Sequence, residues 1–322
     1  MVTDDREGLR IAVIYGGRSA EREISLGSGE EVAQALQGRG HRVTLLDPTL
    51  VDLQTAPLDE YDVAFNALHG SFGEDGQLQE LLDRRGLRYT GSGQHASRLA
   101  FKKSLAKQTF EEAGVATPRA ILGHESNTET ELCVAAESIG FPLVIKPDEQ
   151  GSSLGVSVVS CIEEVIEAFR VAFQFGPVAL CEGFVAGTEW TVPIVDDDLL
   201  PIIQIETAVS YFDFASKYRS DDTRYRFDSS LSDDVIQEIA ETGRQACRAL
   251  GTRGIARVDI RLDHNLSPWV LEVNTSPGMT DHSLVPKAAL QVGLSLGELC
   301  ELTIRRTLGE VVRIPSVEEG TV

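Results

Sequence analysis

The sequence has no long apolar run and few cysteines, and both absences exclude whole classes of protein. No stretch approaches the roughly 20 apolar residues that a helix needs to cross a bilayer. The five cysteines are widely spaced, without a CxxC pair or a Cys/His cluster, so neither a disulfide framework nor a zinc site is indicated. The chain begins with polar and acidic residues instead of the basic and apolar segments of a signal peptide. We therefore expect a soluble, cytoplasmic protein.

Basic residues are scarce as well. Lys and Arg number 29 against 50 Asp and Glu, which gives a net charge of −21. A nucleic-acid binder needs a basic surface, and docking on an anionic membrane needs clustered Lys and Arg. We therefore expect neither nucleic acid nor a membrane as a partner. The length of 322 residues predicts two or three domains with ample core.

The order of apolar and polar segments predicts three parts. Apolar runs alternate with amphipathic stretches in the first third, which is typical of an open α/β sheet. We predict strands at 11–15, 43–46 and 63–68, with a helix at 25–37. This N-terminal α/β domain covers residues 1–100, a smaller α/β segment covers 101–182, and a third segment covers 183–322. The third segment contains a polar loop at about 211–232, a helix at 233–250 and strands at 255–262 and 269–273.

Four polar side chains alternate along the last two predicted strands. Arg257 and Asp259 lie on one strand, and Glu272 and Asn274 lie on the next. Because side chains alternate faces along a strand, each pair points to one side of the sheet. If the strands pair, Asp259, Glu272 and Asn274 form a set of oxygen ligands, which suits Mg²⁺ shared with phosphates. The alternative is a solvated sheet face, where alternating polar residues are ordinary.

A glycine-rich stretch follows another predicted strand. Lys146 and Pro147 end that strand, and residues 151–155 read GSSLG. Glycine-rich backbone approaches phosphate closely and offers N–H donors, although a plain turn between strands fits these residues about as well. The stretch is not a Walker A loop, because the lysine precedes the glycines. Gly16 and Gly17 lack the third glycine of a dinucleotide-binding turn, so we do not expect NAD.

Two more polar stretches follow strands in the N-terminal third. Residues 69–76 read HGSFGEDG and open a helix, at the strand ends where open α/β sheets bind ligands. Residues 20–25 read AEREIS at another helix start. Each has a simpler interpretation: His69 is structural, Asp75 is a helix N-cap, and the acids near residue 21 lie solvated at the positive end of a helix dipole.

Together, four motifs in this order resemble those of the ATP-grasp superfamily and, within it, the D-alanine–D-alanine ligases. Residues 16–25 resemble the opening GGxSxExExS, and residues 69–76 resemble HGxxGEDG. Residues 146–155 match KPxxxGSSxG, and residues 274–284 match NTxPGMTxxSL. The resemblance extends over nearly the whole chain, and the shared order and spacing of the motifs make it specific.

The resemblance implies an α/β protein with the ATP-grasp fold behind an N-terminal open parallel α/β domain. It implies that two D-alanines are joined through an acyl phosphate, with release of ADP and phosphate, for peptidoglycan precursor synthesis. ATP is then the co-substrate, two Mg²⁺ ions are expected with Mn²⁺ as a substitute, and the enzyme is expected to be a homodimer. No protein nucleophile is needed, because phosphoryl transfer depends on positioning and charge neutralisation.

The resemblance also implies residue roles at the first substrate. Glu21 would bind the ammonium group of the first D-alanine, and His69 would line the same pocket. Tyr218, in the mobile lid expected at about 211–232, would link to Glu21 through Ser152. Relatives that accept D-lactate lack this tyrosine, so its presence favours D-alanine as the second substrate.

Further roles follow by motif at the reaction centre. Arg257 and the backbone N–H of Gly278 would form an oxyanion hole. Ser283 and Leu284 would bind the second D-alanine. The residues expected at ATP are Lys103, Lys146, Ser152, Ser153 and Lys217 at the phosphates, Glu182 and Val185 at the adenine, and Glu189 at the ribose. The residues expected at the metal ions are Asp259, Glu272 and Asn274.

Some positions depart from the family pattern. Lys102 stands where an Asp commonly precedes the lysine, Glu80 replaces a small residue, Arg261 interrupts an apolar strand, and residues 225–228 lack the usual Pro-Ala. These departures leave open a paralogous ATP-grasp ligase that joins a different D-amino or D-hydroxy acid, in a specialised or antibiotic pathway. A catalytically silent nucleotide-binding protein on the same fold is a third interpretation.

Overall fold

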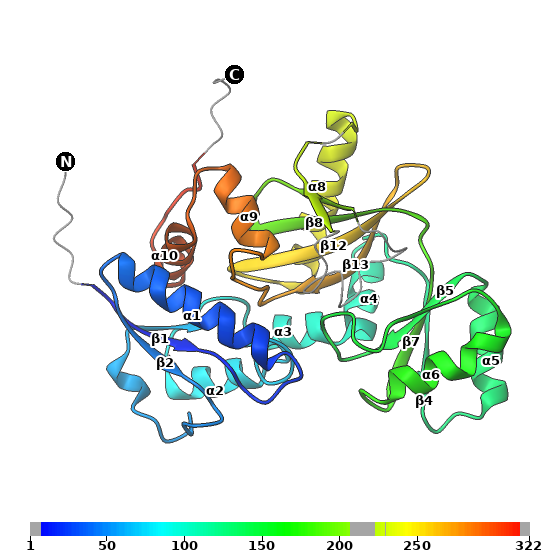
Figure 1. Ribbon diagram of the computed structural model, residues 1–322, viewed down its shortest axis with the longest axis horizontal. Coiled ribbons are helices and arrows are strands. Elements are labelled where there is room, and N and C mark those ends of the chain that lie inside the picture. The colour runs from blue at the N-terminus through cyan, green and yellow to red at the C-terminus, as the bar shows by residue number, and fades with distance from the viewer. Residues whose placement is uncertain (1–7, 207–222, 229, 316–322) are drawn as a thin grey trace.

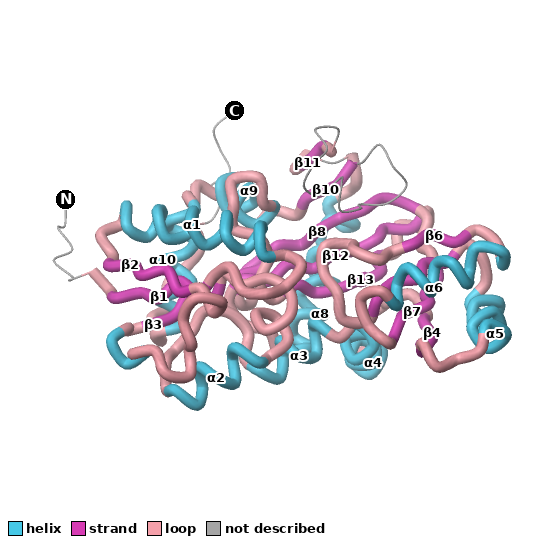
Figure 2. The backbone as a smooth tube through the Cα atoms, turned by 60° about the horizontal axis from the view of Figure 1, so that its bottom comes forward, coloured by secondary structure: helices cyan, strands magenta, loops and turns pink. Residues whose placement is uncertain are grey.

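Three sheets lie in a row along the long axis of the computed structural model, which describes residues 8–206, 223–228 and 230–315 (Figures 1 and 2). The first sheet is parallel, in the order β2-β1-β3. Its central strand is apolar and buried over its last four residues, as expected for a parallel strand covered on both faces. Its elements are β1 (Arg10–Ile14), α1 (Arg22–Gly38), β2 (Arg42–Leu46), η1 (Leu58–Glu60), β3 (Val63–Asn66) and α2 (Gln77–Arg85).

The second sheet is antiparallel, in the order β4-β7-β5-β6. Two helices, α5 and α6, pack their buried side chains against Leu143 and Ile145 of β5. Because side chains alternate along a strand, Val144 and Lys146 point to the opposite face. The elements are α3 (Gln94–Phe101) and α4 (Lys103–Glu112), which lead to the sheet, then β4 (Ala120–His124), α5 (Glu129–Ile139), β5 (Leu143–Pro147), β6 (Ser157–Val159), η2 (Ile162–Glu164), α6 (Val165–Phe173) and β7 (Val178–Gly183).

The third sheet lies between the other two and has the order β11-β10-β8-β12-β13, with β9 paired to β8. Helix α8 is amphipathic, and its apolar side packs on this sheet around Trp190 and Val258. The elements are β8 (Gly187–Val195), β9 (Asp198–Leu199), β10 (Ile203–Glu206), β11 (Arg224–Arg226), α8 (Asp233–Leu250), β12 (Ile255–Asp263) and β13 (Pro268–Asn274).

The C-terminal helices return the chain to the first sheet. Helices α9 (Leu284–Gln291) and α10 (Leu296–Thr307) share a hydrophobic core with β1 and α1, in which Val285 and Leu299 lie with Ile11 and Leu36. The segment before α9 is thereby held against α1, where the N–H of Met279 donates to the Ser28 hydroxyl at 3.1 Å. Residues from both ends of the sequence thus meet beside the first sheet.

The structure confirms the predicted α/β class, with the parallel sheet at the N-terminus and the predicted strands and helices close to their expected positions. One difference is β11, which lies within the loop predicted at about 211–232 and pairs Tyr225 with Ile205. Three residues of alternating Arg and Tyr are too short to signal a strand. The domain divisions near residues 100 and 182 stay predictions. None of the described helices combines the length and apolar character that crossing a membrane requires.

Candidate active site

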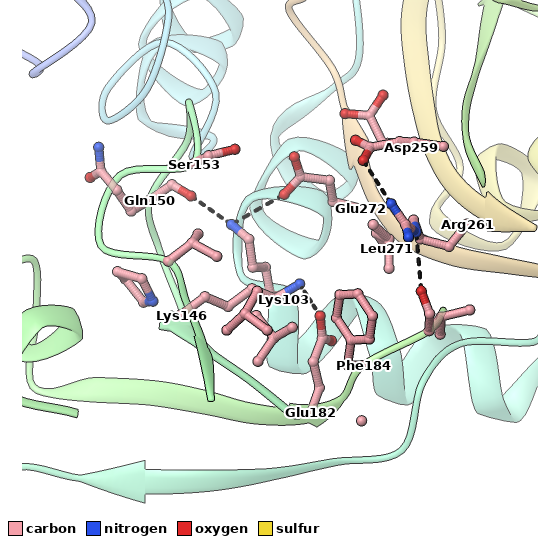
Figure 3. A pocket seen from close by; sticks show the side chains of 17 residues that line it. Lys103, Lys146, Gln150, Ser153, Glu182, Phe184, Asp259, Arg261, Leu271 and Glu272 are labelled. Atoms are coloured by element: carbon pink, nitrogen blue, oxygen red, sulfur yellow. Dashed lines mark hydrogen bonds and ion pairs between the residues drawn. The ribbon is translucent and has the colours of Figure 1, made fainter. Parts of the chain in front are cut away.

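A pocket that is partly open to solvent lies between the second and third sheets (Figure 3). Apolar side chains of Val144, Phe184 and Leu271 line it, and charged side chains converge on it. A largely apolar cleft with a few placed polar groups is the usual form of a small-molecule site. The charged residues are Lys103, Lys146, Glu182, Glu189, Asp259, Arg261 and Glu272.

Lys103, the first residue of α4, contacts both the start of the glycine-rich loop and β13 through its side chain. Its Nζ donates to the Gln150 carbonyl at 2.6 Å and lies 3.5 Å from a carboxylate oxygen of Glu272 (Figure 3). The side chain is buried, so its charge acts in a medium that screens it poorly. Lys103 thus presents a cation where the two sheets face each other, as expected for a residue that binds phosphate.

Glu182 lies between two buried ammonium groups. Lys146 Nζ is 2.5 Å from one carboxylate oxygen and Lys107 Nζ is 2.8 Å from the other. Burial alone would raise the pKa of Glu182, but these two lysines lower it, so the carboxylate is ionised. Lys107 belongs to none of the sequence motifs. Its position four residues after Lys103, hence on the same face of α4, is a signal that could have found it.

Arg261 is a second residue of the pocket that belongs to none of the sequence motifs. Its guanidinium lies in the pocket wall beside Phe184 (Figure 3) and bonds to Val185, Gly187 and Glu189. Val185 and Glu189 are the residues expected at adenine and ribose, and both line this pocket. The alternation of Arg257, Asp259 and Arg261 along β12 is the signal that could have placed the side chain on the pocket face.

The predicted oxygen set is brought together by pairing of β12 with β13. Asp259 lies opposite Glu272, and Arg257 lies opposite Asn274. Arg257 binds both carboxylate oxygens of Asp259 at 2.8 Å, and Asn274 Nδ2 donates to Asp259 at 3.3 Å. Two carboxylates and an amide, without imidazole or thiolate, fit Mg²⁺, which typically takes one or two protein carboxylates and completes its shell with phosphates and water.

This set is smaller than a full protein cage for a cation. Among residues 8–206, 223–228 and 230–315, no three His, Cys, Asp or Glu side chains cluster in a way that could hold a metal ion. The donors present therefore leave most of a six-oxygen shell to be filled by a ligand such as a nucleoside triphosphate.

Glu21 forms a second subsite beside the pocket, at the start of α1. The Ser152 hydroxyl donates to its Oε1, while Oε2 is buried and has no hydrogen-bond partner among the described residues. The carboxylate lies against the backbones of Gly70 and Gly151, where an added Cβ would come within 2.8 Å and 2.6 Å of Oε2. A buried carboxylate oxygen in this state is complementary to an ammonium group, because an unmet acceptor carries its full desolvation cost.

His69 lies in a buried network near Glu21. Its Nδ1 donates to the Ser276 carbonyl at 2.8 Å, and its Nε2 lies 3.1 Å from the Ser28 hydroxyl. The Oε1 atom of Glu74 lies 3.6 Å from His69 Nδ1. Burial, together with the charge of Glu21, raises the pKa of Glu74 to about 7. Burial would lower the pKa of His69, but Glu74 and Glu21 raise it. His69 thus connects α1 to the segment after β13, as in its structural interpretation, and it lies within reach of the charge of Glu21.

The glycine-rich loop serves both subsites at once. Ser153 lines the large pocket, whereas its neighbour Ser152 bonds to Glu21. Both serines adopt left-handed backbone, with φ of 55° and 53°, which is strained for residues with a Cβ. The loop thus holds a residue that lines the pocket and a residue that bonds to Glu21 side by side.

The segment after β13 carries the remaining predicted residues. Ser283 directly precedes α9, and its hydroxyl accepts from the Thr280 N–H at 3.1 Å. A Cβ on Gly278 would meet that hydroxyl at 2.8 Å, so Gly278 and Ser283 are adjacent. Leu284 begins α9 and is buried. Lys217 and Tyr218, which were predicted to lie in a lid, fall outside the described residues.

Two protein-family models match parts of the chain. The model described as D-ala D-ala ligase N-terminus matches residues 48–92, and that described as D-ala D-ala ligase C-terminus matches residues 110–305. Among curated relatives, the D-alanine–D-alanine ligase of Ectopseudomonas mendocina is 44% identical over 291 residues, covering 90% of this chain and 92% of that protein. The one from Halorhodospira halophila is 42% identical over 312 residues, covering 97% and 99%.

Similar solved structures carry related descriptions. A D-alanine–D-alanine ligase from Bacillus anthracis, complexed with ATP, superposes with a TM-score of 0.82 at 30% identity, covering 94% of this chain and 98% of that one. A D-Ala:D-Ser ligase from Enterococcus faecalis superposes with a TM-score of 0.81 at 25% identity, covering 93% and 99%. The predicted ATP-grasp architecture is thereby confirmed.

Proposed function

The chain belongs to the D-alanine–D-alanine ligase family, and we propose that it uses ATP to join two D-alanines into D-alanyl-D-alanine, releasing ADP and phosphate. The product is a precursor of peptidoglycan. The observation that carries this proposal is the buried Glu21 carboxylate, whose Oε2 lacks a hydrogen-bond partner among the described residues, next to a pocket lined by lysines. The positive ammonium group of an amino acid complements the Glu21 carboxylate, and the negative charge of a nucleoside triphosphate complements the lysines of the pocket.

ATP binding follows from the lining of the large pocket. We assign the adenine to the apolar part, beside Phe184, with hydrogen bonds at Glu182 and at the backbone of Val185, and the ribose to Glu189. The triphosphate then lies along Lys103 and Lys146 and the N–H groups of the glycine-rich loop at Ser152 and Ser153. Buried cations stabilise phosphate strongly, because they need no reorganisation when charge develops.

We assign Asp259, Glu272 and Asn274 as ligands of Mg²⁺, with Mn²⁺ as a substitute. When bound, these ions withdraw charge from the phosphate oxygens and so ease transfer of the γ-phosphoryl group. Arg257 limits the repulsion between Asp259 and the triphosphate, since its guanidinium covers both oxygens of that carboxylate.

The first D-alanine binds by its ammonium group at Glu21, with His69 lining the same subsite. Its carboxylate attacks the γ-phosphorus of ATP, ADP leaves, and an acyl phosphate forms. The amine of the second D-alanine then attacks the acyl carbon, losing a proton as the C–N bond forms. The tetrahedral intermediate expels phosphate together with the oxygen that came from the first carboxylate.

The tetrahedral intermediate needs hydrogen-bond donors at its oxyanion. We assign this role to Arg257 and the backbone N–H of Gly278, donors of a type worth about 3 kcal/mol each in transition-state stabilisation. Ser283 and Leu284 bind the carboxylate and side chain of the second D-alanine. The family also supports a cytoplasmic homodimer, which we include in the proposal, and it supports Lys217 and Tyr218 as lid residues that exclude water from the acyl phosphate.

A ligase for a different second substrate is the alternative, and the likeness to a D-Ala:D-Ser ligase favours it. The higher identity to D-alanine–D-alanine ligases over nearly the whole chain weighs against it. Incubation with ATP, Mg²⁺ and D-alanine, alone or paired with D-serine, D-lactate or other D-amino acids, separates the two when phosphate release is followed and products are identified by mass. Dipeptide from D-alanine alone supports the proposal, whereas turnover that requires another D-acid supports the alternative. ATP binding without any turnover contradicts both.

A further inference from the structure

Arg261 is held in a fixed place by three strands of the central sheet. On β12 it lies directly opposite Glu189 of β8 and Trp269 of β13. The residue is 8% exposed. A buried arginine in an apolar strand is costly unless its N–H donors have hydrogen-bond acceptors. The acceptors of this guanidinium therefore indicate its role.

All the partners given by the structure belong to one short stretch of chain. Nε donates to the Val185 carbonyl at 3.1 Å, one terminal nitrogen donates to the Gly187 carbonyl at 2.9 Å, and the other donates to the Glu189 carboxylate at 3.2 Å. The guanidinium carbon also lies 5.6 Å from the centre of the Phe184 ring, within the range of a cation–π contact. Residues 184–189 are thus fixed at four points by one side chain.

This stretch contains the connection from β7 of the second sheet to β8 of the third and also the first residues of β8, and it forms part of the pocket wall. It carries Val185 and Glu189, which the proposed function assigns to adenine and ribose. A connection between two sheets has few backbone partners of its own. The planar fork of arginine, with five donors that stay charged at all working pH values, can meet several of them at once.

We infer that Arg261 is a nucleotide-positioning residue: it holds the backbone of Val185 and the carboxylate of Glu189 in the arrangement that receives adenosine. This inference rests on the proposed function, because it takes the roles of Val185 and Glu189 from it. A preset site binds its ligand more tightly, because the ordering cost is met before binding. Arg261 acts through these residues and has no part in phosphoryl transfer or peptide-bond formation.

The test compares Arg261→Met with the wild type and with Arg170→Met, a surface arginine on α6 that pairs with Glu129. Because a positioning residue contributes to binding equally before and during reaction, we expect the KM for ATP to rise about tenfold in Arg261→Met, the loss that one charged hydrogen bond produces. The kcat and the KM for D-alanine should stay within about twofold. Arg170→Met should resemble the wild type.

A second readout isolates the ribose end of the site. The wild type should discriminate ATP from its 2′-deoxy and 3′-deoxy analogues, and Arg261→Met should lose most of that discrimination, since Glu189 is no longer fixed. Adding Glu189→Gln to Arg261→Met should then raise the KM for ATP little further. A purely structural role would instead affect all substrates alike and leave the discrimination intact, and that result would overturn the inference.

Two measures keep the outcomes separable. If Arg261→Met does not fold, Arg261→Lys replaces it, because lysine keeps the charge but cannot reach all three acceptors. Its KM for ATP should lie between the wild-type value and the tenfold-higher value expected for Arg261→Met. A wild-type KM would overturn the inference. Calorimetric titration with ADP repeats the comparison without turnover. A wild type that binds ADP but makes no dipeptide contradicts the proposed function, whereas unchanged ADP affinity in the variant contradicts the role of Arg261.

Discussion

The Ser152 hydroxyl donates a hydrogen bond to the carboxylate of Glu21, joining two loops that lie 131 residues apart in the sequence. One loop follows the central strand of the parallel sheet, and the other follows β5 beside the nucleotide pocket. The bond occupies only one oxygen of Glu21 and leaves the other buried without a hydrogen-bond partner among the described residues. The same loop that is proposed to bind phosphate therefore also orients the carboxylate proposed to bind the amino acid that is phosphorylated.

Glu21→Gln should lower kcat/KM for D-alanine roughly 100-fold, because the amide cannot pair with an ammonium group. The same change should stabilise the unliganded protein by about 1 kcal/mol, since it removes a buried and partly unpaired charge. Steady-state kinetics and urea unfolding measure the two effects. Glu23→Gln, at an exposed acid of the same helix start, should change neither, and a loss of activity of similar size there would contradict the assignment of Glu21.

Glu272→Gln should abolish D-alanine-dependent phosphate release if Glu272 binds Mg²⁺, because the metal loses one of its two carboxylates. Glu149→Gln is the matched control, since Glu149 also pairs with a lysine beside the pocket but is about half exposed. Phosphate release across a Mg²⁺ titration provides the measurement. Normal turnover in Glu272→Gln at low Mg²⁺ would show that the metal assignment is wrong.

Glu182→Gln should lower the free energy of unfolding by about 3 kcal/mol, because it leaves the buried ammonium groups of Lys107 and Lys146 without their shared counter-charge. Urea denaturation measures this loss. Glu129→Gln, which removes the partner of exposed Arg170, should cost less than about 1 kcal/mol. Equal losses in the two variants would mean that the buried triad contributes no more than a surface pair.

Stability should depend on pH through Glu74. Its pKa is raised from 4.5 to about 7 in the folded protein, so the folded state keeps a proton that the unfolded state loses. The resulting stabilisation is fully present below about pH 4.5 and is lost as the pH rises through about 7, a change of roughly 3 kcal/mol.

Urea unfolding of the wild type and of Glu74→Gln from pH 5 to pH 8 tests this dependence. The variant should lose most of the decline in stability over that range. Glu80→Gln, at a helix acid paired with exposed Arg84, is the control and should keep the wild-type slope. Parallel curves for the wild type and Glu74→Gln would contradict the raised pKa of Glu74.

The sequence predicted the fold class and most elements because both rest on local patterns. The apolar run of β1 and the amphipathic period of α8 are visible in the chain itself. The pairing that places Asp259 opposite Glu272 was predictable from strand alternation once the two strands were assumed to be neighbours. The order and spacing of the motifs then indicated the family, and these motifs contain many of the proposed site residues.

The contacts that the sequence did not predict are those between distant segments. The spacing of Lys103 and Lys107 places both on one face of α4, but the contact of Lys107 with Glu182 depends on how α4 docks against β7. Arg261 likewise looked like an interruption in a strand, since its partners lie more than 70 residues earlier in the chain. The unpartnered oxygen of Glu21 results from burial against Gly70 and Gly151, in two loops distant from Glu21 in the sequence.

Ligation through an acyl phosphate of D-alanine can be tested with D-alanine that carries ¹⁸O in its carboxylate. With ATP and Mg²⁺ present, the released phosphate and the dipeptide are analysed by mass. We expect one ¹⁸O atom in each phosphate released, because the oxygen that bonds to phosphorus leaves with it when the second amine attacks. Dipeptide formed alongside unlabelled phosphate would show that no acyl phosphate is formed.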